Sequence, residues 1–432
     1  MTVDQDTSAG AARCPVAHDF DPFDGTPGAF FEKARQETPV FYHEGIRAYV
    51  LTRYADVKRL LGDRSGAVSA RPALLSHLNV QPMPEAMQVL QGSGFVIAPS
   101  IVDEDGVEHK LHRAVSQPPF SPVRIRGLED FIRNQVAIRL DEIVKTGEAD
   151  LVDAMIYEVP ATVILHMMGV PDEQMGMVKG FRGPWAIFIW GNPDEEVQMT
   201  TAHMMAAFGQ WARGIAQQAI DTPGDDIISE TVRLLQERGE LENSRHWLDS
   251  YTLNVVMAGH ETTTNSAAGG LMSLLENRAQ WEHLVADPSL IPNAVEEILR
   301  YNTGVPTWRQ GLTTDMEFGG VTIPAGSVVY AAINSANRDE DVFGPDSENF
   351  DVARPTAGQH LTFGHGAHTC MGNHLAKMEI RVMLEELVRR LPHMEVVPGQ
   401  HYEFSPNTSQ RGPEHVRARW NPAQNPLPED RP

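Results

Sequence analysis

The chain has 432 residues, of which 41% are hydrophobic, and a formal net charge of −23 at pH 7, so one large domain is the natural interpretation. The acidic balance argues against a nucleic-acid binder and against adhesion to an anionic membrane surface. Two cysteines far apart in sequence make a structural disulfide improbable, and no apolar run predicts a membrane span. A reducing cytoplasm is therefore the expected compartment.

Residues 1–20 and 421–432 are expected to be flexible arms around a single domain at 21–420. Within that domain the pattern is mainly helical, with short strands that form small β-sheets. The expected strands cover residues 39–42, 49–51, 316–323 and 328–332. A region with several prolines, residues 70–100, is expected to be an irregular loop of the kind that carries binding residues.

Three helices are expected in the second half of the chain. The first, at 245–275, contains no proline and would be roughly 45 Å long, enough to cross the whole molecule. Its apolar character and its small central residues indicate that it is buried. The second covers 291–301. The third begins near Cys370, ends before Pro392, and carries apolar residues at steps of three to four.

The segment that leads into Cys370 is the most informative part of the sequence. Gly364 and Gly366 precede the cysteine and Gly372 follows it, so the backbone can adopt positive φ and approach a flat ligand closely. A cysteine at the start of a helix experiences a positive potential that stabilises the thiolate. A thiolate in that position can bind iron and donate electron density to it.

Two other interpretations of this segment stay open on the residues alone. The cysteine could be a buried and inert side chain in a turn. Alternatively, His365, His368, Cys370 and His374 could hold zinc, although structural zinc sites usually draw their ligands from two paired sets.

Residues 363–372 fit Phe-x-x-Gly-x-His-x-Cys-x-Gly in full, and this pattern resembles the heme-binding signature of the cytochrome P450 family. The resemblance implies a mainly α triangular-prism fold with small β-sheets, in which a long central helix crosses the heme. It also implies that Cys370 is the proximal ligand of the iron in heme b and that Phe363 packs beside the sulfur. His368 takes the place of a residue that reaches a heme propionate.

A second segment, Ala258-Gly259-His260-Glu261-Thr262, resembles the oxygen-activation motif of the same family. Ala258 and Gly259 are small enough to leave room for dioxygen above the heme. Glu261 and Thr262 are the expected catalytic pair, because splitting the O–O bond requires protons from a positioned acid and hydroxyl. Without the cysteine segment, these residues would fit the polar face of an ordinary helix.

Three further matches follow the same family. His109 and Arg113 are four residues apart, so both can face one propionate from the same side of a helix. Arg309 matches another propionate-binding arginine. The Glu297-Ile298-Leu299-Arg300 motif, joined by Arg354, is expected to form a buried structural triad.

By this resemblance the protein is a monooxygenase that inserts one atom of dioxygen into a small or medium apolar or aromatic substrate, by hydroxylation or by O- or N-dealkylation. Electrons from NADPH or NADH would arrive through a ferredoxin reductase and a ferredoxin. Residues 404–413 resemble the self-sufficient bacterial members and their thiocarbamate-inducible relatives. The alternatives are a peroxide-driven peroxygenase, a heme-thiolate enzyme that is not an oxygenase, or a non-enzymatic heme or gas-sensing module.

Two sets of residues complete the expectations. The substrate pocket is expected to contain Phe95, Val96, Trp185, Phe188, Val256, Met257, Val305 and Thr307. An acidic ferredoxin needs a locally basic face, for which the candidates are Lys110, His112, Arg124, Arg126, Lys377 and Arg381.

Overall fold

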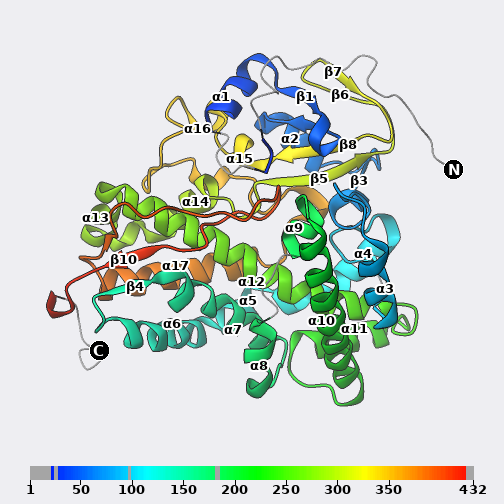
Figure 1. Ribbon diagram of the computed structural model, residues 1–432, viewed down its shortest axis with the longest axis horizontal. Helices are drawn as coiled ribbons and strands as arrows, with labels where there is room; N and C mark the ends of the chain where they lie inside the picture. The colour runs from blue at the N-terminus through cyan, green and yellow to red at the C-terminus, as the bar shows by residue number, and fades with distance from the viewer. Residues whose placement is uncertain (1–20, 24–27, 96–98, 181–184, 425–432) are drawn as a thin grey trace.

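The computed structural model describes residues 21–23, 28–95, 99–180 and 185–424. Figure 1 shows a larger helical part and, beside it, a smaller part built on a five-stranded sheet. Among the described residues, no helix is long and apolar enough to cross a membrane.

The helices of the sheet-containing part are short. They are α1 (Gly28–Glu37), α2 (Tyr54–Leu61), α15 (Ile333–Ala336) and α16 (Glu340–Phe343). The helical part contains α3 (Pro84–Gly92), α4 (Gly106–Ser116), α5 (Pro122–Arg126), α6 (Glu129–Ile143), α7 (Glu158–Met167), α8 (Asp172–Lys179), α9 (Trp185–Trp190), α10 (Glu195–Asp221), α11 (Ile227–Glu237), α12 (Arg245–Glu276), α13 (Arg278–Ala286), α14 (Ile291–Tyr301) and α17 (Asn373–Arg390).

Three small sheets accompany these helices. The largest has the strand order β1-β2-β8-β5-β3, in which only the β2–β8 pair is parallel. Its strands are β1 (Val40–His43), β2 (Ala48–Leu51), β3 (Val68–Ser69), β5 (Thr307–Leu312) and β8 (Val328–Ala332). The other sheets consist of β4 (Glu148–Asp150), β10 (Arg417–Arg419) and β9 (Glu395–Val396), and of β6 (Met316–Phe318) with β7 (Val321–Ile323).

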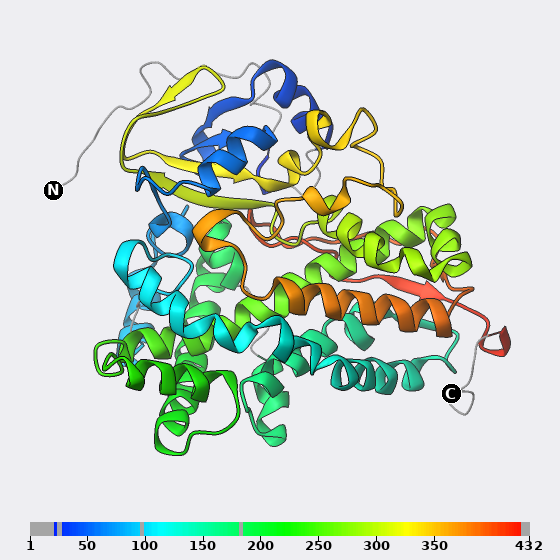
Figure 2. The ribbon, with the colours of Figure 1, turned by 180° about the vertical axis from the view of Figure 1, so that it is seen from behind.

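Helix α12 organises the helical part. Its 32 residues span about 48 Å at 1.5 Å per residue. It contacts α7, α10, α14 and α17, and Figure 2 shows α17 running beside it. Two glycines allow α14 to come close: a Cβ at Gly270 would lie 2.4 Å from Ile298, and one at Gly269 would lie 3.0 Å from Asn302. Small residues at the centre of α12 therefore serve helix packing.

The expected triad is confirmed and ties α14 to the segment that follows α16. Arg300 donates two hydrogen bonds to the Glu297 carboxylate at 2.7 and 2.8 Å, and Arg354 approaches the same carboxylate at 3.5 Å. All three side chains are buried, and Arg300 also donates to three backbone carbonyls. The remaining donors are thus satisfied by main chain, which offsets the cost of burying the charges.

Some predicted elements were wrong in detail. The strand expected at 316–323 is a hairpin, because Gly319 and Gly320 adopt positive φ between β6 and β7. The expected loop at 70–100 contains helix α3. The third helix is confirmed, since it begins at Asn373, three residues after Cys370, and ends at Arg390, before Pro392. Strand β5 was not predicted. The expected C-terminal arm is ordered as far as residue 424, whereas residues 1–20 lie outside the described part of the chain.

Candidate functional site

The loop at 363–372 closes on itself just before α17. The Cys370 N–H donates to the Phe363 carbonyl at 2.8 Å, while Gly364 and Gly366 adopt φ values of 71° and 81°. A Cβ on Gly366 would lie 2.8 Å from the last carbonyl of α2, so only glycine fits there. The loop is therefore held against α2, with its cysteine at a fixed place ahead of α17.

The Cys370 side chain lies deep in the protein but keeps accessible surface, because it faces an internal cavity. Burial raises the pKa of its thiol, and the Gly372 N–H and the Arg113 charge lower it to a smaller extent. The expected stabilisation of a thiolate by the helix start does not prevail, since α17 begins three residues later. A positive centre bound in the cavity would supply the missing stabilisation of the thiolate.

The cavity brings together segments that are far apart in sequence. Cys370 shares it with the middle of α12, with α9, with β5 and with the turn before β5. Its walls are mainly apolar and aromatic and include Trp185, Trp190, Met257, Ala258, Val305 and Trp308. A mostly apolar cavity with a few polar groups is the usual form of a small-molecule or cofactor site.

One end of this site is basic. The rings of His109 on α4 and His368 in the cysteine loop lie 4.0 Å apart, and the His109 Nε2 atom is buried with no hydrogen-bond partner among the described residues. Burial, then the neighbouring His368 and Arg113, lower the pKa of His109 to about 4. An anionic group between these side chains would pair the orphaned nitrogen and reverse that shift.

These observations fit a heme. The Cys370 thiol faces a cavity with apolar walls, and a cluster of two histidines and Arg113 stands where anionic propionates would need partners. Arg113 already uses one nitrogen to donate to the Thr369 carbonyl at 2.6 Å and another to reach the Gln117 side chain. Phe363 also lines the cavity, as expected for a ring beside the sulfur.

The structure does not place Arg309 in this site. Its guanidinium is fully buried and donates to the carbonyls of His77, Ala73, Leu74 and Ile189. Side chains alternate along a strand, so on β5 Trp308 and Gln310 face the cavity while Arg309 faces the other way. Arg309 anchors the segment after β3, and the cavity-facing polar residue of β5 is Gln310.

The expected catalytic pair is divided between two directions. Thr262 lines the cavity and donates its hydroxyl hydrogen to the Ala258 carbonyl at 2.8 Å. Glu261 points away from that cavity and accepts a hydrogen bond from the Trp185 indole at 3.0 Å. Gly259 has a packing role as well as a place in the cavity wall, since its Cβ would lie 2.7 Å from Ile164 on α7.

Of the expected substrate residues, Trp185, Met257 and Val305 line the cavity. Val256 faces a small neighbouring cavity, and Val96 lies outside the described residues. Three others have different roles. Phe95 covers Gly209 on α10, Phe188 packs in an apolar cluster, and Thr307 donates to the Thr408 carbonyl.

Two other aromatic residues of the wall were not among the named substrate residues. Trp190 and Trp308 line the cavity, and their ring centroids lie 6.1 Å apart. Trp190 also packs edge-on against Trp185 at 5.4 Å, and its indole donates to the Ala73 carbonyl. The alternation of strand β5 would have indicated Trp308 and Gln310, had that strand been recognised.

The proposed basic face is smaller than expected. His112 does not belong to it, because its ring is buried, lies 2.8 Å from Glu104 and stacks on Trp247. The other acid-paired candidates are Arg124 with Glu230, Lys377 with Glu296, and Arg381 with Glu129 and Glu385. Lys110 and Arg126 are exposed, with no ion pair to another described residue.

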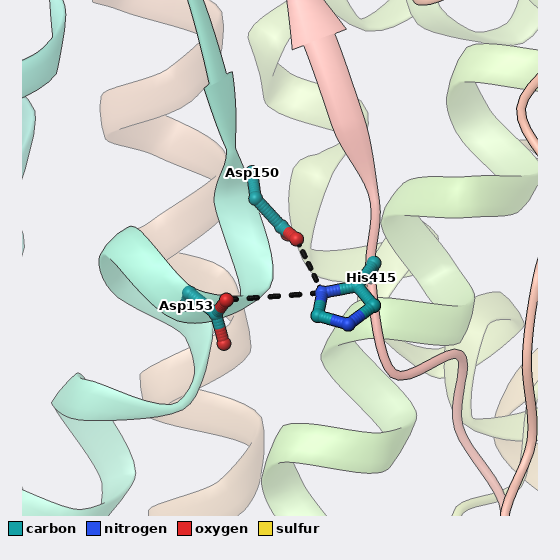
Figure 3. Close-up of side chains that lie close together, drawn as sticks. All are labelled: Asp150, Asp153 and His415. Atoms are coloured by element: carbon teal, nitrogen blue, oxygen red, sulfur yellow. Dashed lines mark hydrogen bonds and ion pairs between the residues drawn. The ribbon is translucent and has the colours of Figure 1, made fainter.

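The zinc alternative finds no support. In the described part of the chain, the histidines around Cys370 do not form a cluster with ligand atoms within 4.8 Å of one another. The group that does is Asp150, Asp153 and His415, shown in Figure 3. Asp150 already accepts hydrogen bonds from His415 and from two backbone N–H groups, so the cluster joins β4 to the segment before β10.

Comparisons with known proteins agree with this geometry. A family model described as cytochrome P450 matches residues 216–413. A steroid C26-monooxygenase of Mycobacterium tuberculosis is 34% identical over 299 residues, which cover 69% of this chain and 79% of that relative.

Two solved structures extend the likeness to nearly the whole chain. An intact type IV self-sufficient cytochrome P450 monooxygenase superposes with a TM-score of 0.91 at 40% identity, over 97% of this chain and 55% of that longer chain. Cytochrome P450 CREJ in complex with (4-ethylphenyl) dihydrogen phosphate superposes with a TM-score of 0.88 at 33% identity, over 94% of this chain and all of that one. The expected fold is therefore confirmed.

Proposed function

Because the chain belongs to the cytochrome P450 family, and is thus a heme b monooxygenase supplied with electrons from NAD(P)H through redox partners, we propose that it oxidises a small or medium aromatic or apolar substrate with Cys370 as the iron ligand. The observation that carries this proposal is the shared cavity. One hollow contains the Cys370 thiol, the Ala258–Thr262 turn of α12 and a wall of three tryptophans.

The heme, when bound, supplies activation of dioxygen and insertion of one oxygen atom into the substrate. The chain would supply the thiolate of Cys370 and, at the basic end, His109, Arg113 and His368 as partners for the propionates. Phe363 and the glycines of the loop keep the backbone close to the sulfur, and α12 covers the other part of the cavity.

Thr262 and Glu261 would move protons toward the reacting oxygen. The Thr262 hydroxyl stands at the cavity surface, where it can exchange its bond to the Ala258 carbonyl for one to a bound molecule. Glu261 lies one residue before it on the side of α12 that faces α9. An acid and a hydroxyl in sequence provide a route for protons into a cavity that is otherwise mostly apolar.

The substrate class follows from the wall that α9 and β5 present. Trp185, Trp190 and Trp308 offer large rigid faces on which a flat molecule can pack. The structurally similar protein CREJ was solved with an aryl ligand, (4-ethylphenyl) dihydrogen phosphate. An alkyl aryl ether or amine held here would lose its alkyl group after hydroxylation of the carbon beside the oxygen or nitrogen.

We propose a separate ferredoxin and ferredoxin reductase as the electron source. Lys110 lies on α4, the helix whose Arg113 donates to Thr369 of the cysteine loop, and Arg126 ends α5, which contacts α17. Both residues are exposed and lack ion pairs to described residues. An acidic partner would be attracted to them although the chain carries a net charge of −23.

A peroxide-driven peroxygenase on the same scaffold is the second candidate. Thr262 at the cavity favours the dioxygen route, because a hydroxyl at the cavity surface could deliver the protons that this route requires. The two functions differ in whether they need an electron donor. A peroxygenase would turn over with hydrogen peroxide alone at rates that match or exceed those with reduced ferredoxin.

The first experiment is a carbon monoxide difference spectrum of the reduced holoprotein. A strongly red-shifted Soret band is expected for thiolate ligation by Cys370, and Cys370→Ser should abolish it. Folded holoprotein without that band would contradict the assignment. A panel of alkyl aryl ethers, aryl phosphates, steroids and fatty acids, scored by the low-spin to high-spin shift, then tests the substrate class. Stronger shifts for steroids than for alkyl aryl compounds would overturn the small aromatic assignment.

A further inference from the structure

Trp185 separates two hollows of the molecule. Its side chain is 5% exposed, lines the cavity that contains Cys370, and also lines the smaller cavity that contains Glu261. Met257, one helical turn before Glu261 on α12, likewise borders both. One tryptophan therefore touches the space where a substrate would lie and, at its indole nitrogen, the acid proposed to move protons.

The geometry of α12 makes this contact consequential. Consecutive helical residues point about 100° apart, so when Thr262 faces the cavity Glu261 faces away from it. The Trp185 indole N–H reaches Glu261 Oε1 at 3.0 Å and holds the carboxyl on the α9 side. To approach the Thr262 hydroxyl, the carboxyl has to leave that hydrogen bond.

The indole position is itself set by the substrate wall. Trp185 packs edge-on against Trp190, whose indole is fixed to the Ala73 carbonyl. A molecule lying on the tryptophan wall presses on Trp185 from the cavity side, whereas Glu261 lies on its other side. Substrate occupancy and the hydrogen bond to Glu261 are therefore linked through one side chain.

We propose that Trp185 is a positioning residue that holds Glu261 away from Thr262 until a substrate occupies the cavity. This inference rests on the proposed function, in which Glu261 and Thr262 carry protons. In the released state, protonated Glu261 would give a proton to Thr262 Oγ while the Thr262 hydroxyl passes its own proton to an oxygen atom of the molecule held in the cavity. The carboxylate left behind would be reprotonated by a hydronium ion from solvent, so the relay moves one proton from solvent to that oxygen.

The test compares two indole-to-phenyl changes in the holoenzyme. Trp185→Phe keeps a packed ring but removes the N–H, and Trp211→Phe is the matched control because its indole donates to Gln174 outside both cavities. With a plant-type ferredoxin couple and no substrate, Trp185→Phe should consume dioxygen several-fold faster per enzyme than wild type or the control, because the released Glu261 speeds proton delivery. Adding Glu261→Gln should return the rate to the wild-type level. Equal rates in Trp185→Phe and Trp211→Phe would overturn the proposal.

A spectroscopic readout tests the same contact without turnover. With 5-fluorotryptophan at all seven tryptophans, the Trp185 fluorine resonance is assigned from its loss in Trp185→Phe. It should shift when 4-phenylimidazole fills the cavity and should change in Glu261→Gln, while the Trp211 resonance stays unchanged. A Trp185 resonance that stays unchanged in both experiments would contradict the link between cavity occupancy and the hydrogen bond from Trp185 to Glu261.

The proton route through Glu261 and its control by Trp185 can be tested separately. If Glu261→Gln alone leaves product formed per electron unchanged, the proton route in the proposed function is wrong. If Glu261→Gln lowers that ratio but Trp185→Phe behaves like Trp211→Phe, only the control by Trp185 is wrong.

Discussion

The imidazole of His109 lies against that of His368, with ring centroids 4.0 Å apart and an angle of 30° between the ring planes. One ring comes from α4 and the other from the cysteine loop, so this contact joins two segments that are 259 residues apart in sequence. Burial, followed by the neighbouring His368 and Arg113, disfavours protonation of His109 and lowers its pKa to about 4. An anion from the cofactor resolves that unfavourable arrangement.

The first prediction concerns this contact. His109→Phe keeps a ring against His368 but removes the orphaned Nε2. Losing one hydrogen bond to a charged group costs about 1.5–3 kcal/mol, which corresponds to about 10- to 100-fold faster heme loss. Transfer of heme to apomyoglobin measures that rate. His393→Phe, at an exposed histidine, is the control and should leave the rate of heme loss unchanged. An unchanged rate in His109→Phe would show that His109 does not bind a propionate.

The second prediction concerns Thr262. Thr262→Ala removes the only cavity-facing hydroxyl of the Ala258–Thr262 turn, and positioned proton transfer commonly contributes at least about 10²-fold to a rate. We expect product per electron to fall to about a tenth as peroxide rises. Thr262→Ser restores the hydroxyl and should restore most of the coupling. Unchanged coupling in Thr262→Ala would exclude Thr262 from the proton route.

Much of the fold could be predicted, because the hydrophobic periodicity of a long, regular segment is enough to identify it as a helix. α12 and α14 match the expected 245–275 and 291–301 within one residue. The first is a long apolar segment without proline, and the second begins next to Pro292 and ends before Asn302, so their limits are marked in the sequence. The hairpin of β6 and β7 was read as one strand, although Gly319-Gly320 between them indicates a turn. Short strands such as β3 and β9 depend on partners that the sequence does not identify.

Site residues could be predicted where a sequence motif identifies them. They could not be predicted where the direction of a side chain determines whether the residue faces the cavity. Cys370, Thr262 and Ala258 line the cavity as expected. Arg309 does not, because a shift of one residue on β5 moves a side chain to the other face of the sheet, and Gln310 takes the cavity side. His112 looked like a free basic residue because nothing local indicated that Glu104, eight residues earlier, would turn back to pair with it.

A third prediction addresses the buried triad. Glu297→Gln would leave the Arg300 charge buried with only carbonyl partners, and breaking such a pair commonly costs 3–5 kcal/mol, so we expect a loss of about 4 kcal/mol in the free energy of unfolding. Denaturant unfolding measures it. The exposed pair of Arg278 and Glu282 supplies the comparison: Glu282→Gln should cost about 0–1 kcal/mol. Similar losses in both variants would contradict the structural role of the triad.

The fourth prediction concerns pH and Glu379 on α17. This side chain is fully buried, and burial raises the pKa of its carboxyl well above the usual 4.5 against a smaller opposing effect of the Thr263 hydroxyl. A carboxyl with a raised folded-state pKa stabilises the fold below its unfolded pKa, and this contribution is lost as pH rises toward the folded value. Wild type should therefore lose stability between pH 5 and pH 8 relative to Glu379→Gln, by up to about 1.4 kcal/mol per pH unit. Melting temperatures across that range measure the difference, and parallel curves would show that Glu379 is already ionised in the fold.

The last prediction concerns the electron donor. Lys110 and Arg126 are the exposed basic candidates without ion pairs to described residues, so reversing both charges should weaken docking of an acidic ferredoxin. Lys110→Glu with Arg126→Glu should raise the KM for ferredoxin about 10-fold at low salt and leave kcat nearly unchanged, because orientation of the bound partner depends on shorter-range contacts. The effect should shrink as ionic strength rises toward 0.5 M, where charges are screened over a few ångströms. Arg233→Glu with Arg238→Glu, at two exposed arginines on and directly after α11, is the control for the same change in net charge. An equal rise in KM for that control would show that ferredoxin senses the overall charge of −23 rather than this face, and an unchanged KM in the double variant would place the docking surface elsewhere.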